Sequence, residues 1–532
     1  MRTIKPCHLL CAGGLLLATV AVPAQARQSL DEHINAFWSP DYLGPFECQL
    51  GILNNSPLGL PRCMQVSNIQ YHLGMFYAIA EANEGNRAAG LPGYRASIDY
   101  IQQTLESAGY EVTLQPFPFT AFYPVAEGEL QSVAPQMEDY LWNEDFTYVS
   151  QTDGGDVAGP VYAVDLQPGL GNTSTSGCEA SDFAGFPAGA IALVQRGTCT
   201  FGEKAANAAE AGAAGVLIFN QGDSEDRTGL ENVTLGEDYN GGIPVFFATY
   251  DLGLALASQA GAEVRMVANV VREQTETWNL LAETRRGRDD NVIMVGAHLD
   301  SVFEGAGIND NGSGSAAVLE LALQMAKARP RNKVRFAWWG AEEAGLVGST
   351  YYVQNLTEEE KNRIAVYLNF DMIGSPNYAY FIYDGDGSDF DLAGPPGSAA
   401  TEALFEEYFW LRGLPSEGTE ISFRSDYAQF FEEGIPFGGL FTGAEVEKTE
   451  AQAEQYGGEA GIPFDPCYHE PCDTLINVDE QALEINADAM AYVTSTLARS
   501  TRRLEKEEPP AEPQMLRSIQ FEKTHWGKYW IR

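Results

Sequence analysis

The sequence predicts an α/β protein: a doubly wound, mostly parallel sheet flanked by helices, with a second, β-rich region inserted into it. Between residues 273 and 505, short apolar runs such as Val292–Ala297 alternate with segments of helical period, which is typical of βαβ units. A helix, helix, strand series stands before residue 125, and a stretch rich in Gly and Ala separates the two parts. A chain of 532 residues is also too long for one ordinary domain.

The first part of the predicted sheet domain covers residues 64–125. Apolar spacing predicts a helix from about Ile69 and, after the turn at Gly90–Gly93, a second helix over Ser97–Ala108. A strand over Tyr110–Phe119 follows. We therefore expect the domain to begin here and to resume after the insert.

The second part covers residues 273–505 and supplies most of the sheet. Its expected elements are an edge strand at 280–283, a central strand at Val292–Ala297, a helix at Ser313–Ala328, a strand at Val334–Trp339, a helix opening at Glu342 or Glu343, strands at Val366–Asp371 and Tyr378–Tyr383, and helices near 400–411 and 480–503. This alternation predicts helices on both faces of the sheet.

The first 26 residues have the pattern of an export signal. Arg2 and Lys5 form a charged start, Leu9–Val22 is apolar, and Ala24–Ala26 gives an A-x-A cleavage site. We therefore expect a secreted or periplasmic protein. Residues 27–63 are an N-terminal segment or a propeptide, and residues 506–532 form a tail that begins with a Pro- and Glu-rich linker.

Cleavage of the signal would remove two cysteines and leave six in an exported chain. They fall into three near pairs, which predicts three local disulfides. Zinc–thiolate clustering is the alternative, but the chain has no CxxC motif. The expected pairs are Cys48–Cys63, Cys178–Cys199 and Cys467–Cys472.

The chain is strongly acidic. Its formal charge of −42 becomes −44 without the signal, because Arg2 and Lys5 leave and no acid does. Such a charge argues against nucleic acid or an anionic membrane as a partner. No run after the signal approaches the roughly 20 apolar residues of a membrane span, so we expect no stable membrane insertion. The sequence carries no indication of the oligomeric state.

Polar side chains follow the predicted strands at their carboxyl ends, where open α/β sheets bind ligands. His298 and Asp300 come after the Val292–Ala297 strand, and Asp310 lies in a Gly- and Asn-rich loop ten residues beyond Asp300. Asp371 follows another strand. An imidazole and several carboxylates at one sheet edge predict a metal site.

Two further segments add to this set. Glu342 and Glu343 are adjacent carboxylates after the VRFAWW strand, so that one could hold a metal while the other addresses a water. His469 stands between Cys467 and Cys472, where a disulfide would make a rigid loop. Two His, two Asp and two Glu suit zinc, and two ions could share one carboxylate. Each residue alone also has an ordinary structural explanation: a core histidine, a turn residue or a helix start.

The region 126–272 resembles the protease-associated domain found in many exocellular peptidases. The matching residues are IALVQRGTCTFGEKAANAAEAGAAGVLIFN, with Cys178 and Cys199 as the bridge. It carries no group of residues suited to catalysis, so we expect a spacer or lid rather than a second active site.

The motifs GAHLDS, GINDNGSG, WWGAEEAGLVGS, LNFDMIG, FRSDYAQF and CYHEPCDT, in this order, resemble the secreted co-catalytic di-zinc aminopeptidases. The resemblance implies two zinc ions per chain and peptide substrates with a free N-terminus. It implies that His298 and Asp371 bind one ion, that Glu343 and His469 bind the other, and that Asp310 bridges them.

The same resemblance assigns roles around the metals. Glu342 would be the general base, Asp300 would orient His298, and Tyr468 would hydrogen-bond the oxyanion. Arg424 and Asp426 match a substrate-side segment. The family often has a cis peptide after the bridging aspartate, here Asp310–Asn311.

Three other readings of this fold remain. A glutaminyl cyclase would use one zinc for acyl transfer, and the full two-metal set beside Glu342 argues against it. A carboxypeptidase would need a basic pocket, for which only Arg424 is a candidate. A receptor-like, non-catalytic protein would have lost ligands, and the set here is intact.

Overall fold

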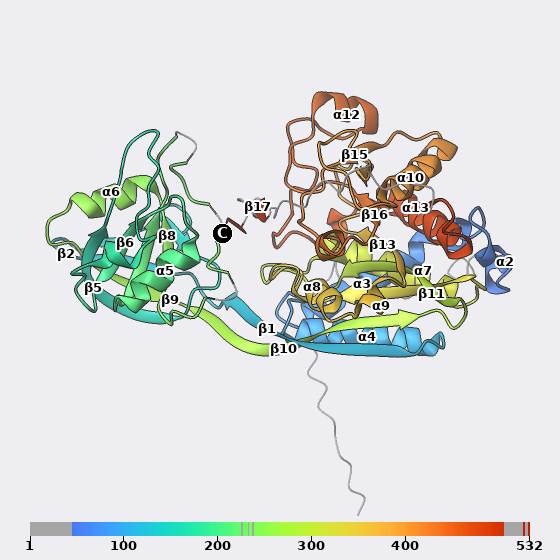
Figure 1. Cartoon of the computed structure of the whole chain (residues 1–532), viewed down its shortest axis with the longest axis horizontal. Helices are drawn as coiled ribbons and strands as arrows, with labels where there is room; N and C mark the ends of the chain where they lie inside the picture. The colour runs from blue at the N-terminus through green and yellow to red at the C-terminus, as the bar shows by residue number, and fades with distance from the viewer. Residues whose placement is uncertain are drawn as a thin grey trace, which may run out of the picture.

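The computed structural model describes residues 45–504, apart from 225–226, 232 and 237–238, together with the short stretches 525–526 and 530–531. The expected export signal (1–26), residues 27–44 of the segment 27–63 and nearly all of the tail 506–532 lie outside these residues. Two eight-stranded sheets form two bodies, and the long strands β1 and β10 join them (Figure 1).

The main sheet has the strand order β1-β10-β12-β11-β13-β16-β14-β15. Its strands are β1 (Val112–Pro124), β10 (Val270–Glu283), β11 (Arg288–His298), β12 (Asn332–Trp339), β13 (Ile364–Phe370), β14 (Phe381–Tyr383), β15 (Glu417–Thr419) and β16 (Phe437–Phe441). The four central strands, β12, β11, β13 and β16, are parallel. Antiparallel neighbours enclose them, since β10 pairs with β12 and β14 with β16.

One expected position in this sheet is wrong. The segment 280–283 does not form an edge strand but is the end of β10, which pairs with β12 on one side and β1 on the other. The edge is β1, because its register against β10 continues from Val112↔Ala282 to Pro124↔Val270. A sheet order of this kind depends on pairing between distant segments, which local sequence patterns do not encode.

Helices cover both faces of the main sheet, as a doubly wound fold requires. Along β11, Ile293 and Val295 pack into one core and Met294 into the other, which explains why this strand is apolar throughout. The first core includes α3 (Val66–Glu81), α4 (Pro92–Ser107), α7 (Gly314–Met325), α10 (Ser398–Arg412) and α13 (Glu480–Arg499); the second includes α8 (Val347–Gln354) and α11 (Ala428–Glu432). Short helices α2 (Phe46–Gln49), α9 (Glu358–Lys361) and α12 (Glu450–Tyr456) lie at the periphery.

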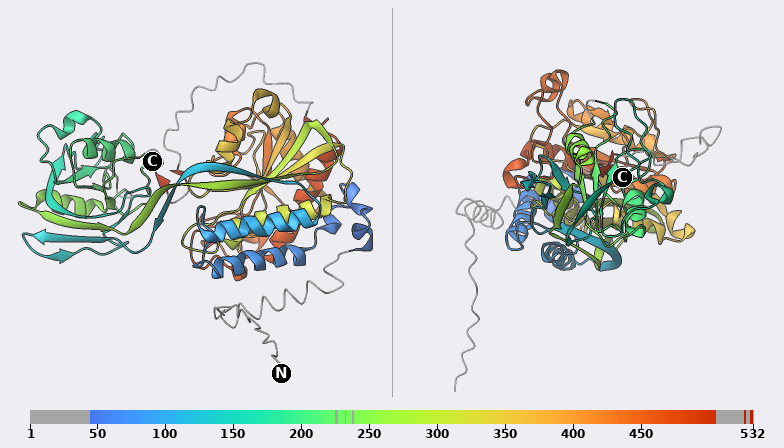
Figure 2. Two further views of the ribbon diagram at one scale, coloured as in Figure 1. Left: turned by 90° about the horizontal axis from the view of Figure 1, so that it is seen from below. Right: turned by 90° about the vertical axis from the view of Figure 1, so that its left-hand side faces the viewer.

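The inserted body has its own sheet, in the order β3-β2-β9-β5-β6-β7-β8-β4. Its elements are β2 (Glu129–Ala134), β3 (Glu138–Asp139), β4 (Phe146–Tyr148), β5 (Gly155–Val164), β6 (Ile191–Gln195), α5 (Phe201–Glu210), β7 (Gly215–Phe219), β8 (Val245–Ala248), α6 (Tyr250–Ser258) and β9 (Glu263–Ala268). Thr200 caps α5 in a capping box with Glu203. Two apolar clusters on its two faces give this body a core of its own, and Figure 2 shows it set apart from the main body.

Three disulfides join Cys48 to Cys63, Cys178 to Cys199 and Cys467 to Cys472. No helix in the described residues combines the length and apolar character that a bilayer span needs.

Candidate active site

The end of β11 places His298 at the carboxyl edge of the main sheet. Its Nδ1–H donates to the backbone carbonyl of Asp300 at 3.1 Å, and because a carbonyl can only accept, the lone pair is on Nε2. The Asp300 carboxylate lies 3.8 Å from Nδ1 and accepts the backbone N–H groups of Glu342 and Glu343 at 3.2 and 3.3 Å. Asp300 therefore fixes the backbone at Glu342 and Glu343 and also lies near His298.

The loop after His298 brings Asp310 opposite the imidazole. The peptide Asp310–Asn311 is cis. Asp473 fixes this loop, because its carboxylate oxygens accept the N–H groups of Asn309 at 2.8 Å and Asp310 at 3.0 Å. The Asp310 side chain is thereby held with its two oxygens pointing in different directions.

The two glutamates lie in a turn and not at a helix start. Residues 340–346 form this turn, with Ala341 at φ 55° and Leu346 at φ 61°, and α8 begins only at Val347. The prediction of a helix opening at Glu342 or Glu343 is therefore wrong. The Asp300 carboxylate captures the two N–H groups that a helix start would have left free.

Two further segments complete the group. Asp371 follows β13, and its Oδ2 accepts the Ser425 hydroxyl at 2.6 Å, which turns Oδ1 toward His298. His469 lies in the loop that the Cys467–Cys472 disulfide closes, with φ 58°. Its ring is stacked on Tyr468 at 3.9 Å between centroids.

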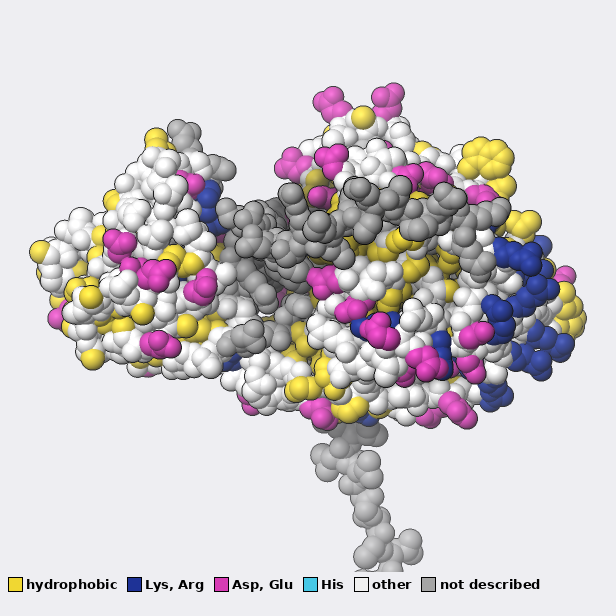
Figure 3. Space-filling model, in the orientation of Figure 1, with side chains coloured by type: hydrophobic (Ala, Val, Ile, Leu, Met, Phe, Trp, Pro, Cys, Tyr) yellow, Lys and Arg dark blue, Asp and Glu magenta, His cyan; other side chains and the backbone are white. Residues whose placement is uncertain are grey.

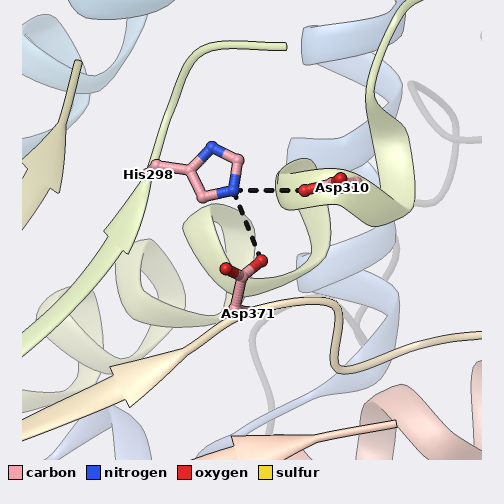
Figure 4. Close-up of side chains that lie close together, drawn as sticks. All are labelled: His298, Asp310 and Asp371. Carbon is pink, nitrogen blue, oxygen red and sulfur yellow. Dashed lines mark ion pairs between the residues drawn. The ribbon is translucent and has the colours of Figure 1, made fainter. Parts of the chain in front are cut away.

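Five side chains form two donor sets that share Asp310. His298 Nε2 lies 3.1 Å from Asp310 Oδ1 and 3.3 Å from Asp371 Oδ1 (Figure 4). His469 Nε2 lies 3.2 Å from Asp310 Oδ2 and 3.0 Å from Glu343 Oε2. Ligands at about 2.0–2.1 Å in a tetrahedron are roughly 3.3 Å apart, so both sets have the size of a zinc site.

Unpaired acceptors agree with this fit. Asp371 Oδ1 and Glu343 Oε1 are buried and have no hydrogen-bond partner, which is costly unless a cation is bound. One nitrogen and two carboxylate oxygens in each set are ligands that zinc accepts. Each set therefore offers donors of the kind and spacing that a zinc ion accepts.

Glu342 differs from the other carboxylates. Its Oε2 is 3.9 Å from His298 Nε2, farther than the atoms of either donor set. Burial raises the pKa of Glu342 well above its ordinary value; His298 opposes this and Glu343 adds to it. A carboxylate with a raised pKa is a stronger base than an ordinary one.

A pocket opens over these groups, and its lining includes Tyr468 and Arg424. Arg424 pairs with Glu445 at 3.0 Å, and its Nη2 donates to the Tyr468 hydroxyl at 3.4 Å. Asp426 does not line the pocket: it is only 1% exposed, so the expectation that it faces substrate is wrong. Burial raises the pKa of Asp426 to about 8. Its neighbour Ser425 forms part of the lining in its place.

Three supporting residues were not singled out from the sequence. Asp473 stands in the CYHEPCDT motif and could have been noticed there. Ser425 lies between Arg424 and Asp426. Arg87 offered no signal, because it comes from the loop between α3 and α4; its guanidinium donates to the backbone carbonyls of Leu299, Ala306 and Gly307. It thus holds the loop that joins His298 to Asp310.

Comparisons with known proteins place the chain among peptidases. Residues 279–494 match the model of peptidase family M28, and residues 157–256 match the PA domain. An aminopeptidase of Pseudomonas aeruginosa is 60% identical over 531 residues, covering 99% of both chains.

Solved structures give the same result. An aminopeptidase from Aneurinibacillus sp. strain AM-1 has 27% identity and a TM-score of 0.63 over 83% of this chain and 95% of its own. A zinc aminopeptidase from Bacillus subtilis has 25% identity and a TM-score of 0.58 over 84% and 97%. With a 60% identical relative aligned over 99% of both chains and both family models matched, the chain belongs to peptidase family M28 and carries a PA domain.

Proposed function

We propose that this protein is an exported aminopeptidase that removes N-terminal residues from peptides with the help of two zinc ions. One observation carries the proposal: the two oxygens of Asp310 face two different histidines, each of which has a second carboxylate of its own. The names of the related proteins and the three disulfides support the activity and the export.

The proposed ligands follow from the donor sets. His298 and Asp371 would hold one ion, Glu343 and His469 the other, with Asp310 between them. Bound zinc lowers the pKa of water and polarises a peptide carbonyl. The carboxylates would leave little net charge on the two ions, and Asp473 and Ser425 would keep the ligands in place.

Glu342 is the proposed general base. It would take a proton from the attacking water and pass it to the leaving amine, a transfer that its raised pKa favours. The Tyr468 hydroxyl would donate to the oxygen on which negative charge develops. Arg424 donates to the oxygen of that hydroxyl, so the hydroxyl can itself act as a donor.

The pocket walls indicate what the substrate presents. Beside the acidic groups, the lining includes the apolar or aromatic side chains Met372, Tyr383, Tyr427, Phe441 and Ala444. They favour a large apolar N-terminal residue. The insert at 126–272 would act as a spacer or lid beside the catalytic parts 64–125 and 273–505.

A pair of substrates tests the activity. The enzyme should cleave leucyl anilide and leave N-acetyl-leucyl anilide intact, because an aminopeptidase requires the free amine. Equal rates on both would contradict the proposal. Cyclisation of an N-terminal glutamine without hydrolysis would favour a glutaminyl cyclase, and release of C-terminal residues a carboxypeptidase.

A further inference from the structure

The amino-terminal edge of the main sheet carries a concentration of positive charge that the overall composition hides. Eight exposed Lys and Arg side chains there have no carboxylate within 4 Å in the described structure: Arg62, Arg285, Arg286, Lys327, Arg329, Arg331, Arg499 and Arg502. We call these residues the basic edge. In a chain with 74 acidic and 32 basic residues, most exposed cations would be expected to lie near a carboxylate.

The remaining cations of the described chain behave differently. Away from this edge they are paired with acids, as Arg95 with Asp99 and Arg265 with Asp156, or buried, as Arg87, Lys204 and Lys448. The dark blue side chains in Figure 3 accordingly gather at the end of the molecule where Figure 1 places α2. The surface charge is therefore unevenly distributed: the basic edge is positive, although the chain as a whole is negative.

Large apolar side chains stand among these cations. Phe46, Leu50, Ile52 and Leu58 are 67%, 57%, 59% and 70% exposed. The Cys48–Cys63 disulfide closes the loop that carries Leu50, Ile52 and Leu58, and Phe46 lies two residues before it. Asn55 ties this loop to the basic edge by accepting from the Arg329 N–H at 2.6 Å and the Arg499 guanidinium at 2.7 Å. The apolar groups are thus held next to the cations of the basic edge.

We propose that this surface docks the enzyme on the face of an anionic lipid bilayer. Cations that surround exposed aromatic and aliphatic side chains match the composition of surfaces that adsorb to lipid headgroups. The acidic remainder of the molecule does not prevent this, since charges beyond about 10 Å are largely screened at physiological ionic strength. The whole-chain charge excludes an anionic membrane only if it is spread evenly.

The position of the surface leaves the catalytic pocket free. Strand β11 begins at the basic edge with Arg288, whose N–H donates to the carbonyl of Arg331, and ends at His298. Eleven residues of strand span roughly 30 Å. A docked enzyme would therefore direct its pocket away from the lipid and toward soluble peptides.

Vesicle co-sedimentation tests the proposal on the full exported chain. The protein should bind vesicles of phosphatidylcholine with phosphatidylglycerol, bind pure phosphatidylcholine much more weakly, and be released by added salt. The triple variant R329Q, R331Q, R502Q should lose about a hundredfold in binding, since each cation near such a surface contributes about fivefold. The double variant F46S, I52S should lose about tenfold or more.

Matched controls separate the surface from general charge. R95Q, R227Q and R265Q together remove the same net charge elsewhere and should leave vesicle binding within about twofold. All variants should keep their melting temperatures and their rates on a soluble anilide. Equal losses in the control triple variant, equal binding to both kinds of vesicle, or binding to soluble polyphosphate in place of vesicles would each overturn the proposal.

Discussion

The main body and the inserted body both bury polar side chains around parallel strands, but they use them differently. In the main body, five separate segments bring imidazoles and carboxylates within 3.0–3.3 Å, and buried oxygens of Asp371 and Glu343 have no partner. In the insert, Arg196 donates to Glu231, and Lys204 donates to the carbonyl of Ser176 at 2.5 Å. Buried polarity therefore does not by itself mark a site.

The main body differs because its polar side chains come from distant segments to one place and keep buried oxygens without a hydrogen-bond partner. Its imidazoles and carboxylates point at a common space, whereas the buried cations Arg196 and Lys204 of the insert each donate to a neighbouring acceptor. We conclude that the buried polar groups of the main body serve catalysis and that those of the insert stabilise its fold. The following experiments test that division, from the largest expected effect to the smallest.

The substitution Glu342→Gln should lower kcat at least about a thousandfold while the bound zinc is retained, because an amide cannot accept the proton from water. Steady-state rates on leucyl anilide and elemental analysis measure the two quantities. Glu420→Gln is the matched control, since Glu420 lies at the same pocket but is exposed. A rate near that of the wild type for Glu342→Gln would exclude its role as base.

The substitution Tyr468→Phe should lower kcat about a hundredfold with little change in KM, as expected when one oxyanion donor is lost. Tyr383→Phe provides the control, because Tyr383 also lines the pocket and the substitution removes only a hydroxyl that is given no part in stabilising charge. If KM rose and kcat stayed constant, Tyr468 would bind substrate and not stabilise charge.

The substitution Phe247→Ala in the insert should cost about 3–5 kcal/mol of that body's unfolding free energy, because Phe247 is fully buried against Phe201. The kcat on a small anilide should stay within about twofold. Urea unfolding followed by both fluorescence and activity would separate the two bodies. A similar loss of kcat in enzyme that is still folded would show that the insert takes part in catalysis.

Lys204 gives a smaller effect that depends on pH. Burial lowers the pKa of Lys204 from 10.5 to about 8, although Asp182 and Glu203 oppose the shift. The folded insert thus binds this proton more weakly than the unfolded chain, so its stability should rise from about pH 8 to about pH 10.5.

Below pH 8 both states are protonated, and the full penalty for burying the charge applies. Lys204→Met should remove this dependence, which amounts to at most about 3 kcal/mol, with no effect on kcat. Unfolding midpoints of the variant and the wild type at pH 7 and pH 10 measure it. Identical pH dependence in the two proteins would show that Lys204 is not responsible.

Local sequence patterns were sufficient for the segments that carry the site and for the strands of the main sheet except β15 and β16. The apolar run before His298 and the AEE, LNFD and CYHEPC segments each predicted a polar group at a strand end or in a constrained loop. Local patterns could not predict the sheet order, because β1 and β10 pair with each other although the whole insert lies between them in the sequence. The turn at Glu342 was missed for the same reason, since its acceptor, Asp300, is 42 residues away.

Supporting contacts were the least predictable part of the site. Arg87 reaches loop carbonyls more than 200 residues away, and nothing in its neighbourhood of the sequence marks it. Asp426 was misplaced because a motif gives the identity of a residue but not the direction of its side chain. The resemblance supplied roles, whereas distances such as those around Asp310 required coordinates.

The zinc content of the purified enzyme tests the central idea most directly. Inductively coupled plasma mass spectrometry on wild-type protein, after dialysis against metal-free buffer, should give two zinc ions per chain. Two ions are expected because each Asp310 oxygen has its own histidine and its own second carboxylate. One ion or none in active enzyme would contradict the shared site.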